Sequence, residues 1–200
     1  VGLVLVVHPS VPARSIRELI ALAKAHPGKL NYGSGGVGSI TQFSAELFNM
    51  MAGTKISHVP YKGVGQALID VLAGRIDACY IVGPGALEHI RSGRLRALGI
   101  AAPTRWNGLP DVPTIAEAGV KGYSYDIWYG FWFPAGTPVE YVTRIHSEVV
   151  KVFEDPEAKR TFAAQGYILV GSTPQEFSKT IVDEIELHRR LVARMGFTPQ

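Results

Sequence analysis

Short apolar runs alternate with longer amphipathic runs through the first hundred residues, and this alternation limits the possible folds more than any other feature. The opening run VGLVLVV and four later runs have the length and apolar content of buried strands: residues 30–32, 56–59, 77–82 and 95–101. Between these runs, apolar residues recur at the spacing of a helix face, and glycines end the patterns at positions 28, 53, 74 and 93. Alternating strands and helices predict an α/β fold with mainly parallel sheets flanked by helices.

The composition changes near residue 128, where the aromatic run WYGFWF occupies 128–133 and has the pattern of a strand. Two long amphipathic helices are predicted after it. Each begins with Thr-Pro-x-Glu, at 137–140 and 173–176, in which threonine caps the helix, proline takes its first position and glutamate completes the capping box. We therefore expect a domain boundary between residues 127 and 128.

Charge and cysteine content exclude several classes of protein. The 20 basic and 17 acidic residues give a net charge of +3 and are spread without long runs, which does not favour a nucleic-acid partner. Cys79 is the only cysteine, so a disulfide within the chain is impossible, and we expect a buried thiol. The chain begins inside a strand pattern without a methionine, so we expect it to be part of a longer protein.

The run NYGSGGVGS at 31–39 is the strongest local motif. Gly33, Gly35 and Gly38 fit the spacing G-x-G-x-x-G, which occurs in dinucleotide-binding loops. Such loops need an acidic residue about 20 positions later, and the run GTKISHVP at 53–60 contains none. A nicotinamide-dependent oxidoreductase that uses the 33–38 loop is therefore the alternative function, and no cofactor is expected.

Anion binding is the simpler interpretation of the same loop. The turn places the backbone N–H groups of residues 35–39 at a helix N-terminus, and we expect these groups to be free for a carboxylate or phosphate. A second turn, HVPYKG, opens the next helix at the same sheet edge. Together the two turns predict a ligand site formed by Tyr32, Ser34, Gly35, Gly36, Val37, Gly38, Ser39, Tyr61, Lys62, Gly63 and Asp77. Tight turns without a ligand, a solvated Lys62 and a strand-end role for Asp77 remain alternatives.

The motifs of an enzyme are missing from the sequence. No serine lies in a G-x-S-x-G elbow, and the six histidines include no H-E-x-x-H pair. We therefore expect neither catalytic residues nor a bound metal. His58, at the carboxyl end of a strand beside the predicted site, is the histidine of greatest interest.

Several segments, taken together and in order, resemble the Bug proteins, which are the substrate-binding receptors of tripartite tricarboxylate transporters. The segments are LVLVVHPSVPARSIRELIALAKAHPGKLNYGSGGVGS, HVPYKG, LAGRID, GRLRALGIA, LPDVPTIAEAG, FWFPAGTP and GSTPQEF. The resemblance implies a two-lobed fold like that of type 2 periplasmic binding proteins. Val1 would lie near the crossing into the second lobe. Residues 1–127 would form lobe 2, and residues 128–200 the return crossing and the C-terminal part of lobe 1, with the N-terminal portion of lobe 1 lacking.

The resemblance also implies a function. The protein would be a periplasmic, monomeric solute-binding protein that captures a small organic carboxylate and presents it to the membrane permease subunits of the transporter. An effector-sensing domain is a third possibility. Two positions depart from the family pattern: Gln42 stands where histidine is common, and the run IVGP at 81–84 stands where an acidic residue or asparagine is common.

Overall fold

The computed structural model describes residues 2–195, so the crossing expected at Val1 lies outside the described residues. The chain divides into two compact units, Val1–Ile127 and Trp128–Gln200. Each unit is described by itself below.

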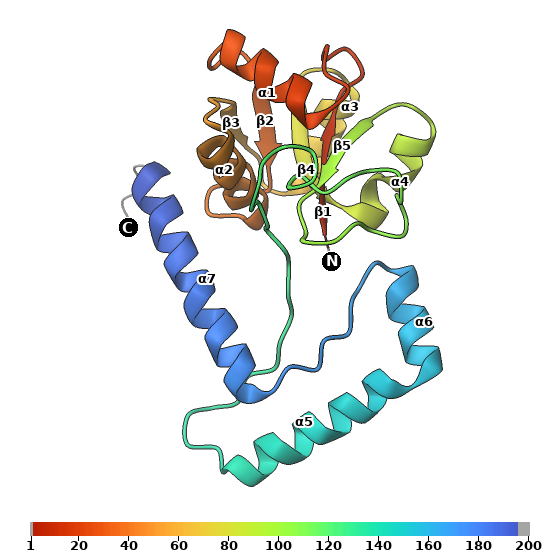
Figure 1. Cartoon of the computed structure of the whole chain (residues 1–200), viewed down its shortest axis with the longest axis vertical. Coiled ribbons are helices and arrows are strands. Elements are labelled where there is room, and N and C mark those ends of the chain that lie inside the picture. Colours follow the sequence, from red (N-terminus) through yellow and green to blue (C-terminus); the bar gives the residue numbers. More distant parts are fainter. Residues whose placement is uncertain (1, 196–200) are drawn as a thin grey trace. The chain divides into compact units, whose positions relative to one another are not determined.

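Unit 1 contains a five-stranded sheet, at the centre of its four helices in Figure 1. The strands are β1 (Leu3–Val7), β2 (Asn31–Ser34), β3 (Ser57–Pro60), β4 (Ala78–Val82) and β5 (Arg96–Ile100), in the order β3-β2-β4-β1-β5. As expected, β2 is parallel to both β3 and β4. The first strand runs antiparallel to both of its neighbours, so the sheet is mixed.

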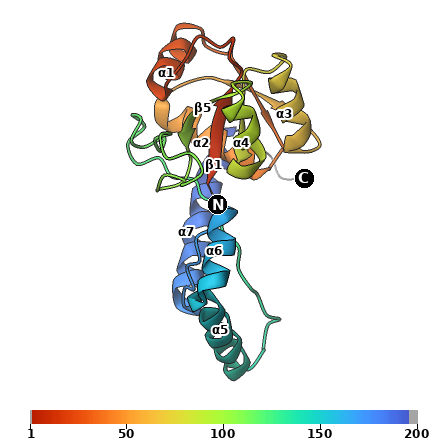
Figure 2. The same ribbon diagram turned by 90° about the vertical axis from the view of Figure 1, so that its right-hand side faces the viewer.

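The predicted strand at the start of the chain is confirmed, since all five residues of β1 are buried. Both faces of this central strand are apolar because helices cover both sides of the sheet. Val4 and Val6 pack into a cluster with Val71 of α3 and Ala86 of α4. Helices α1 (Ile16–Ala25), α2 (Ile40–Ala52), α3 (Val64–Leu72) and α4 (Gly83–Arg91) each follow a strand, as Figures 1 and 2 show.

Both capping boxes expected in unit 1 begin helices. The Ser15 side chain accepts a hydrogen bond from the Glu18 N–H, and the Ser39 side chain accepts one from the Gln42 N–H. Gly53 ends α2 in the left-handed conformation, with a φ of 63°. Local sequence signals therefore set both ends of α2, the helix that follows the glycine loop.

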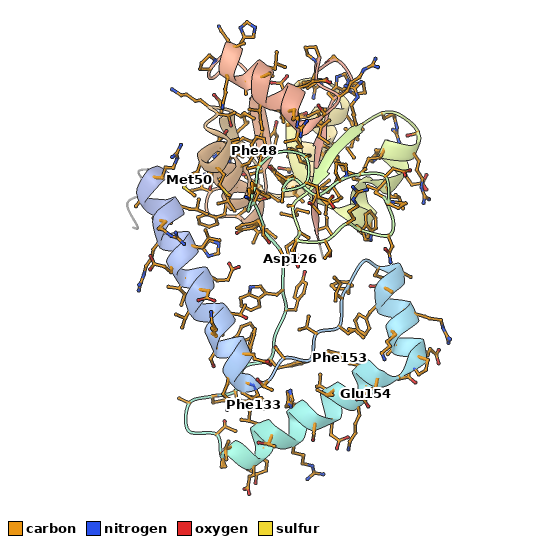
Figure 3. All side chains as sticks on the ribbon, viewed as in Figure 1. Phe48, Met50, Asp126, Phe133, Phe153 and Glu154 are labelled. Atoms are coloured by element: carbon orange, nitrogen blue, oxygen red, sulfur yellow. The ribbon has the colours of Figure 1, made fainter. Side chains whose placement is uncertain are left out.

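Unit 2 consists of helices and irregular segments in its described part. Its helices are α5 (Val139–Glu154), α6 (Pro156–Ala164) and α7 (Pro174–Met195). In Figure 3, Phe153 lies near the C-terminal end of α5, and its ring approaches Gly171, which the chain reaches after α6. Neither α5 nor α6 has a fully buried residue, so their apolar faces remain open within this unit.

The prediction of a strand at 128–133 is wrong, because the segment has no regular structure in unit 2. Its aromatic rings pack on α7 instead of alternating across a sheet. Trp128 and Trp132 lie 5.1 and 5.4 Å, between ring centroids, from Phe177. The rings of Tyr129 and Tyr167 lie 5.9 Å apart.

The two Thr-Pro-x-Glu motifs behave differently. Thr173 and Glu176 form the expected capping box, with the Thr173 N–H donating to Glu176 Oε2 at 2.8 Å. The motif at 137–140 forms none, since the Thr137 hydroxyl donates to the Pro134 carbonyl and α5 has no side-chain cap. The predicted cap at Thr137 is therefore wrong.

Candidate functional site

The glycine loop and the second turn lie together at one edge of the sheet. Residues 35–39 follow β2 and lead into α2, and residues 61–63 follow β3 and lead into α3. Because β2 and β3 are parallel, both connections leave from their carboxyl ends. The Tyr61 N–H donates to the Ser34 carbonyl at 3.2 Å, and a Cβ on Gly36 would lie 2.9 Å from the Tyr61 carbonyl oxygen.

Most amides of the glycine loop already have partners within the protein. The N–H groups of four loop residues donate as follows: Gly35 to Thr41 Oγ1 at 2.9 Å, Gly36 to Ser34 Oγ at 3.1 Å, Gly38 to Gln42 Oε1 at 2.7 Å, and Ser39 to the Gly36 carbonyl at 3.2 Å. The expectation that the amides of 35–39 are free is therefore wrong for four of the five. Short polar side chains on β2 and the first turn of α2 are close enough to satisfy them.

Three donors at this helix start remain available. The N–H groups of Val37, Ile40 and Thr41 have no acceptor within residues 2–195. Ile40 and Thr41 occupy the first two positions of the 13-residue α2, where the helix dipole favours an anion. The side chains of Val37 and Ile40 are 56% and 46% exposed, so apolar groups flank these donors.

The second turn offers similar donors. Helix α3 has Gly63 at its N-cap and no side-chain cap. The N–H groups of Lys62, Gly63 and Val64 find no acceptor in the described part of the chain. Lys62 is exposed and makes no ion pair within residues 2–195, so a cationic side chain stands beside the amides.

A hydrogen-bond network under the loop joins Ser34, Gln42 and His58. The Ser34 hydroxyl, which is fully buried, lies 2.6 Å from His58 Nε2 and 3.1 Å from both polar backbone atoms of Gly36. Gln42 Nε2 lies 3.0 Å from His58 Nδ1. Burial lowers the pKa of His58, and the nearby Glu46 carboxylate opposes that shift.

Tyr32, a predicted ligand contact, supports this network from below. Its ring is buried and stacks on His58 at a centroid distance of 5.0 Å. Its hydroxyl donates to Glu46 Oε1 at 2.6 Å. Burial and that carboxylate raise the pKa of Tyr32 far above its ordinary value, so the phenol stays neutral.

The other predicted side chains are also engaged within the protein. Ser39 Oγ caps α2 and lies 3.0 Å from Thr41 Oγ1. The Tyr61 hydroxyl donates to Asp70 Oδ2 at 2.7 Å, and Asp70 pairs with Arg75. The candidate site is therefore formed mainly by backbone N–H groups and Lys62.

Asp77 does not join the loop. It precedes β4, and its Oδ2 accepts from the Asn31 N–H at 2.8 Å, while the Asp77 N–H donates to Asn31 Oδ1. Asn31 begins β2, so this reciprocal pair lies at the amino edge of the parallel strands, opposite the edge that carries residues 35–39. The strand-end role for Asp77 is the one that the structure supports.

Sequence reasoning missed the amides of Ile40 and Thr41 and treated Gln42 only as a departure from a family pattern. The capping-box position of Gln42 was a usable signal, because its side chain can reach back to a preceding N–H. Here it reaches the Gly38 N–H, one residue before the N-cap. At the third helix start, the Trp106 ring covers Gly83, where a Cβ would lie 2.7 Å from the indole.

The comparison with known families is decisive. The model of the tripartite tricarboxylate transporter family receptor matches residues 1–197. The chain belongs to this receptor family. Protein BugT of Bordetella pertussis is 36% identical over 196 residues, which are 98% of this chain and 60% of BugT. The chain thus spans about 60% of the length of the curated relatives that it matches most closely in the comparison.

Solved structures of receptors have the same fold. Rpa4515 from R. palustris, with adipate, is 32% identical with a TM-score of 0.84, and the match covers 100% of this chain and 67% of that one. MatC from Rhodopseudomonas palustris, with bound malate, is 25% identical with a TM-score of 0.70, and the match covers 96% and 64%. The predicted α/β fold of the type 2 periplasmic-binding-protein kind is confirmed, and the family lends no support to an oxidoreductase.

Two searches within the described residues add no further site. No helix there is long and apolar enough to cross a bilayer. No three His, Cys, Asp or Glu side chains within residues 2–195 gather as a metal ion would need.

Proposed function

We propose that the protein is a periplasmic, monomeric receptor that captures a small organic carboxylate and delivers it to the membrane permease subunits of a tripartite tricarboxylate transporter. It performs no chemistry on the ligand. The receptor family and its relatives with adipate and malate support this proposal. The observation that carries it is the set of unused N–H donors at the starts of α2 and α3, beside Lys62.

Carboxylate binding follows from the chemistry of these donors. Backbone N–H groups at a helix N-terminus hold an anion without the desolvation cost of a buried lysine or arginine. Each hydrogen bond to a charged oxygen contributes about 1.5–3 kcal/mol. Three such bonds, less the cost of association, fit micromolar affinity, or roughly −8 kcal/mol.

We propose further that residues 1–127 form lobe 2, and that residues 128–200 form the return crossing and the C-terminal part of lobe 1. The division of the chain after Ile127 supports this assignment. The exposed apolar side chains of α5, among them Val139, Tyr141 and Ile145, need further protein to cover them. The additional length of the relatives is the natural source of that cover.

A proline scan of the first helical position tests the donor set. Ile40→Pro removes one N–H at a position that tolerates proline, and Ser39 has a φ of −74° and a ψ of 155°, which suit the residue before a proline. Ile40→Ala keeps the N–H and removes the same side chain. Titrations of the full-length protein with adipate, malate, citrate and benzoate should show binding that Ile40→Pro weakens by about 10- to 100-fold relative to Ile40→Ala.

Two results would contradict the proposal. Equal affinity of the two Ile40 variants would remove α2 from the site. Saturable binding of NADPH, without a response to any acid, would favour the oxidoreductase that we set aside.

A further inference from the structure

The hydrogen bonds under the glycine loop define the protonation of His58. The Gly38 N–H donates to the side-chain oxygen of Gln42, so the Gln42 amide presents its NH₂ group to His58 Nδ1. Nδ1 must then be an acceptor, and the proton of the neutral ring lies on Nε2, 2.6 Å from Ser34 Oγ. Ser34 accepts that bond and donates its own proton to the Gly36 carbonyl.

A second proton on His58 breaks this chain of bonds. An Nδ1–H would face the NH₂ group of Gln42, donor against donor. Rotation of the Gln42 amide would relieve that contact, but it would turn the NH₂ group toward the Gly38 N–H. The cost therefore reaches Gly38 whichever way Gln42 turns, because a buried N–H without an acceptor costs free energy.

Charged groups near the ring are few. Glu46, from α2, is the charged residue whose field acts on His58, and its Oε1 is already bonded to the Tyr32 hydroxyl. Tyr32, from β2, stacks on the ring as a neutral phenol. The attraction of Glu46 favours the protonated ring, but burial outweighs it, and the pKa of His58 lies below its usual value.

We propose that His58, acting through Gln42, is a positioning residue for the glycine loop, and that the loop presents its free N–H groups to a carboxylate only while the His58 ring is neutral. The inference rests on the proposed function. Ligand affinity is then full above the usual pH range of imidazole titration and falls as the pH drops through the pKa of His58 in the folded protein. One proton is involved, so the dissociation constant rises by up to tenfold per pH unit below that pKa.

The test compares the full-length wild-type protein with His58→Asn from about pH 7.5 to about pH 4.5. Asparagine offers an oxygen near the place of Nδ1, accepts from Gln42 and does not titrate. Adipate and malate are the probes, and comparison at each pH cancels the protonation of the ligand itself. We expect wild type to lose affinity toward low pH relative to His58→Asn. The matched control His26→Asn, at an exposed histidine that ends α1, should follow the wild-type profile.

A measurement without ligand separates this inference from the proposed function. Nitrogen-15 resonances of the His58 ring should show an unprotonated Nδ1 at neutral pH, and the Gly38 amide shift should follow the same titration. Parallel affinity profiles for wild type and His58→Asn, or a Gly38 amide that ignores the titration of His58, would overturn the inference. Failure of wild type to bind any acid would instead refute the proposed function, and the Gly38 titration would still decide the positioning role.

Discussion

Substitution of single glycines by alanine in the two turns tests how tightly the loop is built. Gly36 has a φ of +122°, and a Cβ there would lie 2.9 Å from the Tyr61 carbonyl oxygen. Gly38 has a φ of +77° with open space around the Cβ position. Gly63 has an extended backbone, with a φ of 173°, and equally open space. The three positions thus combine strain with a clash, strain alone, and neither.

The expected losses of unfolding free energy follow from these surroundings. Gly38→Ala should cost about 1–2 kcal/mol, the penalty for a left-handed alanine. Gly36→Ala adds a contact shorter than real Cβ atoms make with backbone, and we expect about 3 kcal/mol in total. Gly63→Ala should stay within about 0.5 kcal/mol of wild type, since a stiffer unfolded chain offsets a poorer N-cap.

Urea unfolding followed by circular dichroism measures the order of the three variants, provided that the dependence on urea stays constant. Carboxylate affinity should fall in Gly36→Ala, because the loop must move away from Tyr61, and should change little in Gly63→Ala. Equal midpoints for Gly36→Ala and Gly38→Ala would show that the approach to Tyr61 does not constrain the loop. A Gly63→Ala variant less stable than Gly36→Ala would refute the reasoning altogether.

Three further predictions concern residues outside the loop. Asp77→Ala should lower the unfolding free energy by about 1–3 kcal/mol, through the unpaired Asn31 N–H, and leave carboxylate affinity unchanged; weaker binding would return Asp77 to the site. Burial raises the pKa of Cys79 to about 12, so a thiol reagent such as DTNB should label it only in denaturant, and rapid labelling of the folded protein would contradict its place in the core. Glu176→Gln should lower the melting temperature more than Glu140→Gln. Hydrogen bonds from the Thr173 backbone hold the pKa of Glu176 below its usual value, so its contribution is present at neutral pH and lost as the pH falls through that pKa; equal effects of the two variants would refute this.

Much of unit 1 could be predicted because its signals are local. Apolar runs, serine caps and closing glycines lie within a few residues of the elements that they define, and α1 and α2 begin where the capping boxes place them. The antiparallel direction of β1 was not predictable in the same way, since direction depends on contacts with Ala78–Val82 and Arg96–Ile100, far along the chain. The irregular course of 128–133 has a similar cause, because Phe177 of α7, rather than a neighbouring strand, packs against its tryptophans.

The site was predicted in position but not in its donors. The spacing of glycines and the parallel strands indicated that loop 35–39 and turn 61–63 would meet, and they do. Which amides stay free depends on where Ser34, Thr41 and Gln42 direct their side chains, and no spacing rule contains that information. Asp77 was misplaced because it comes before β4, at the edge opposite the glycine loop.

The bonded amides of the glycine loop strengthen the argument for a carboxylate site, although they reduce the number of donors. A loop with five free N–H groups would have to be ordered by its ligand, and that ordering would cost about 0.5–1.5 kcal/mol for each group immobilised. Here the bonds of Gly35, Gly36, Gly38 and Ser39 already fix the turn. The remaining donors on Val37, Ile40 and Thr41 are therefore held in place before any ligand arrives. A receptor that must bind at low concentration and then release its ligand gains from this arrangement, because affinity comes from a few preorganised bonds rather than from many flexible ones.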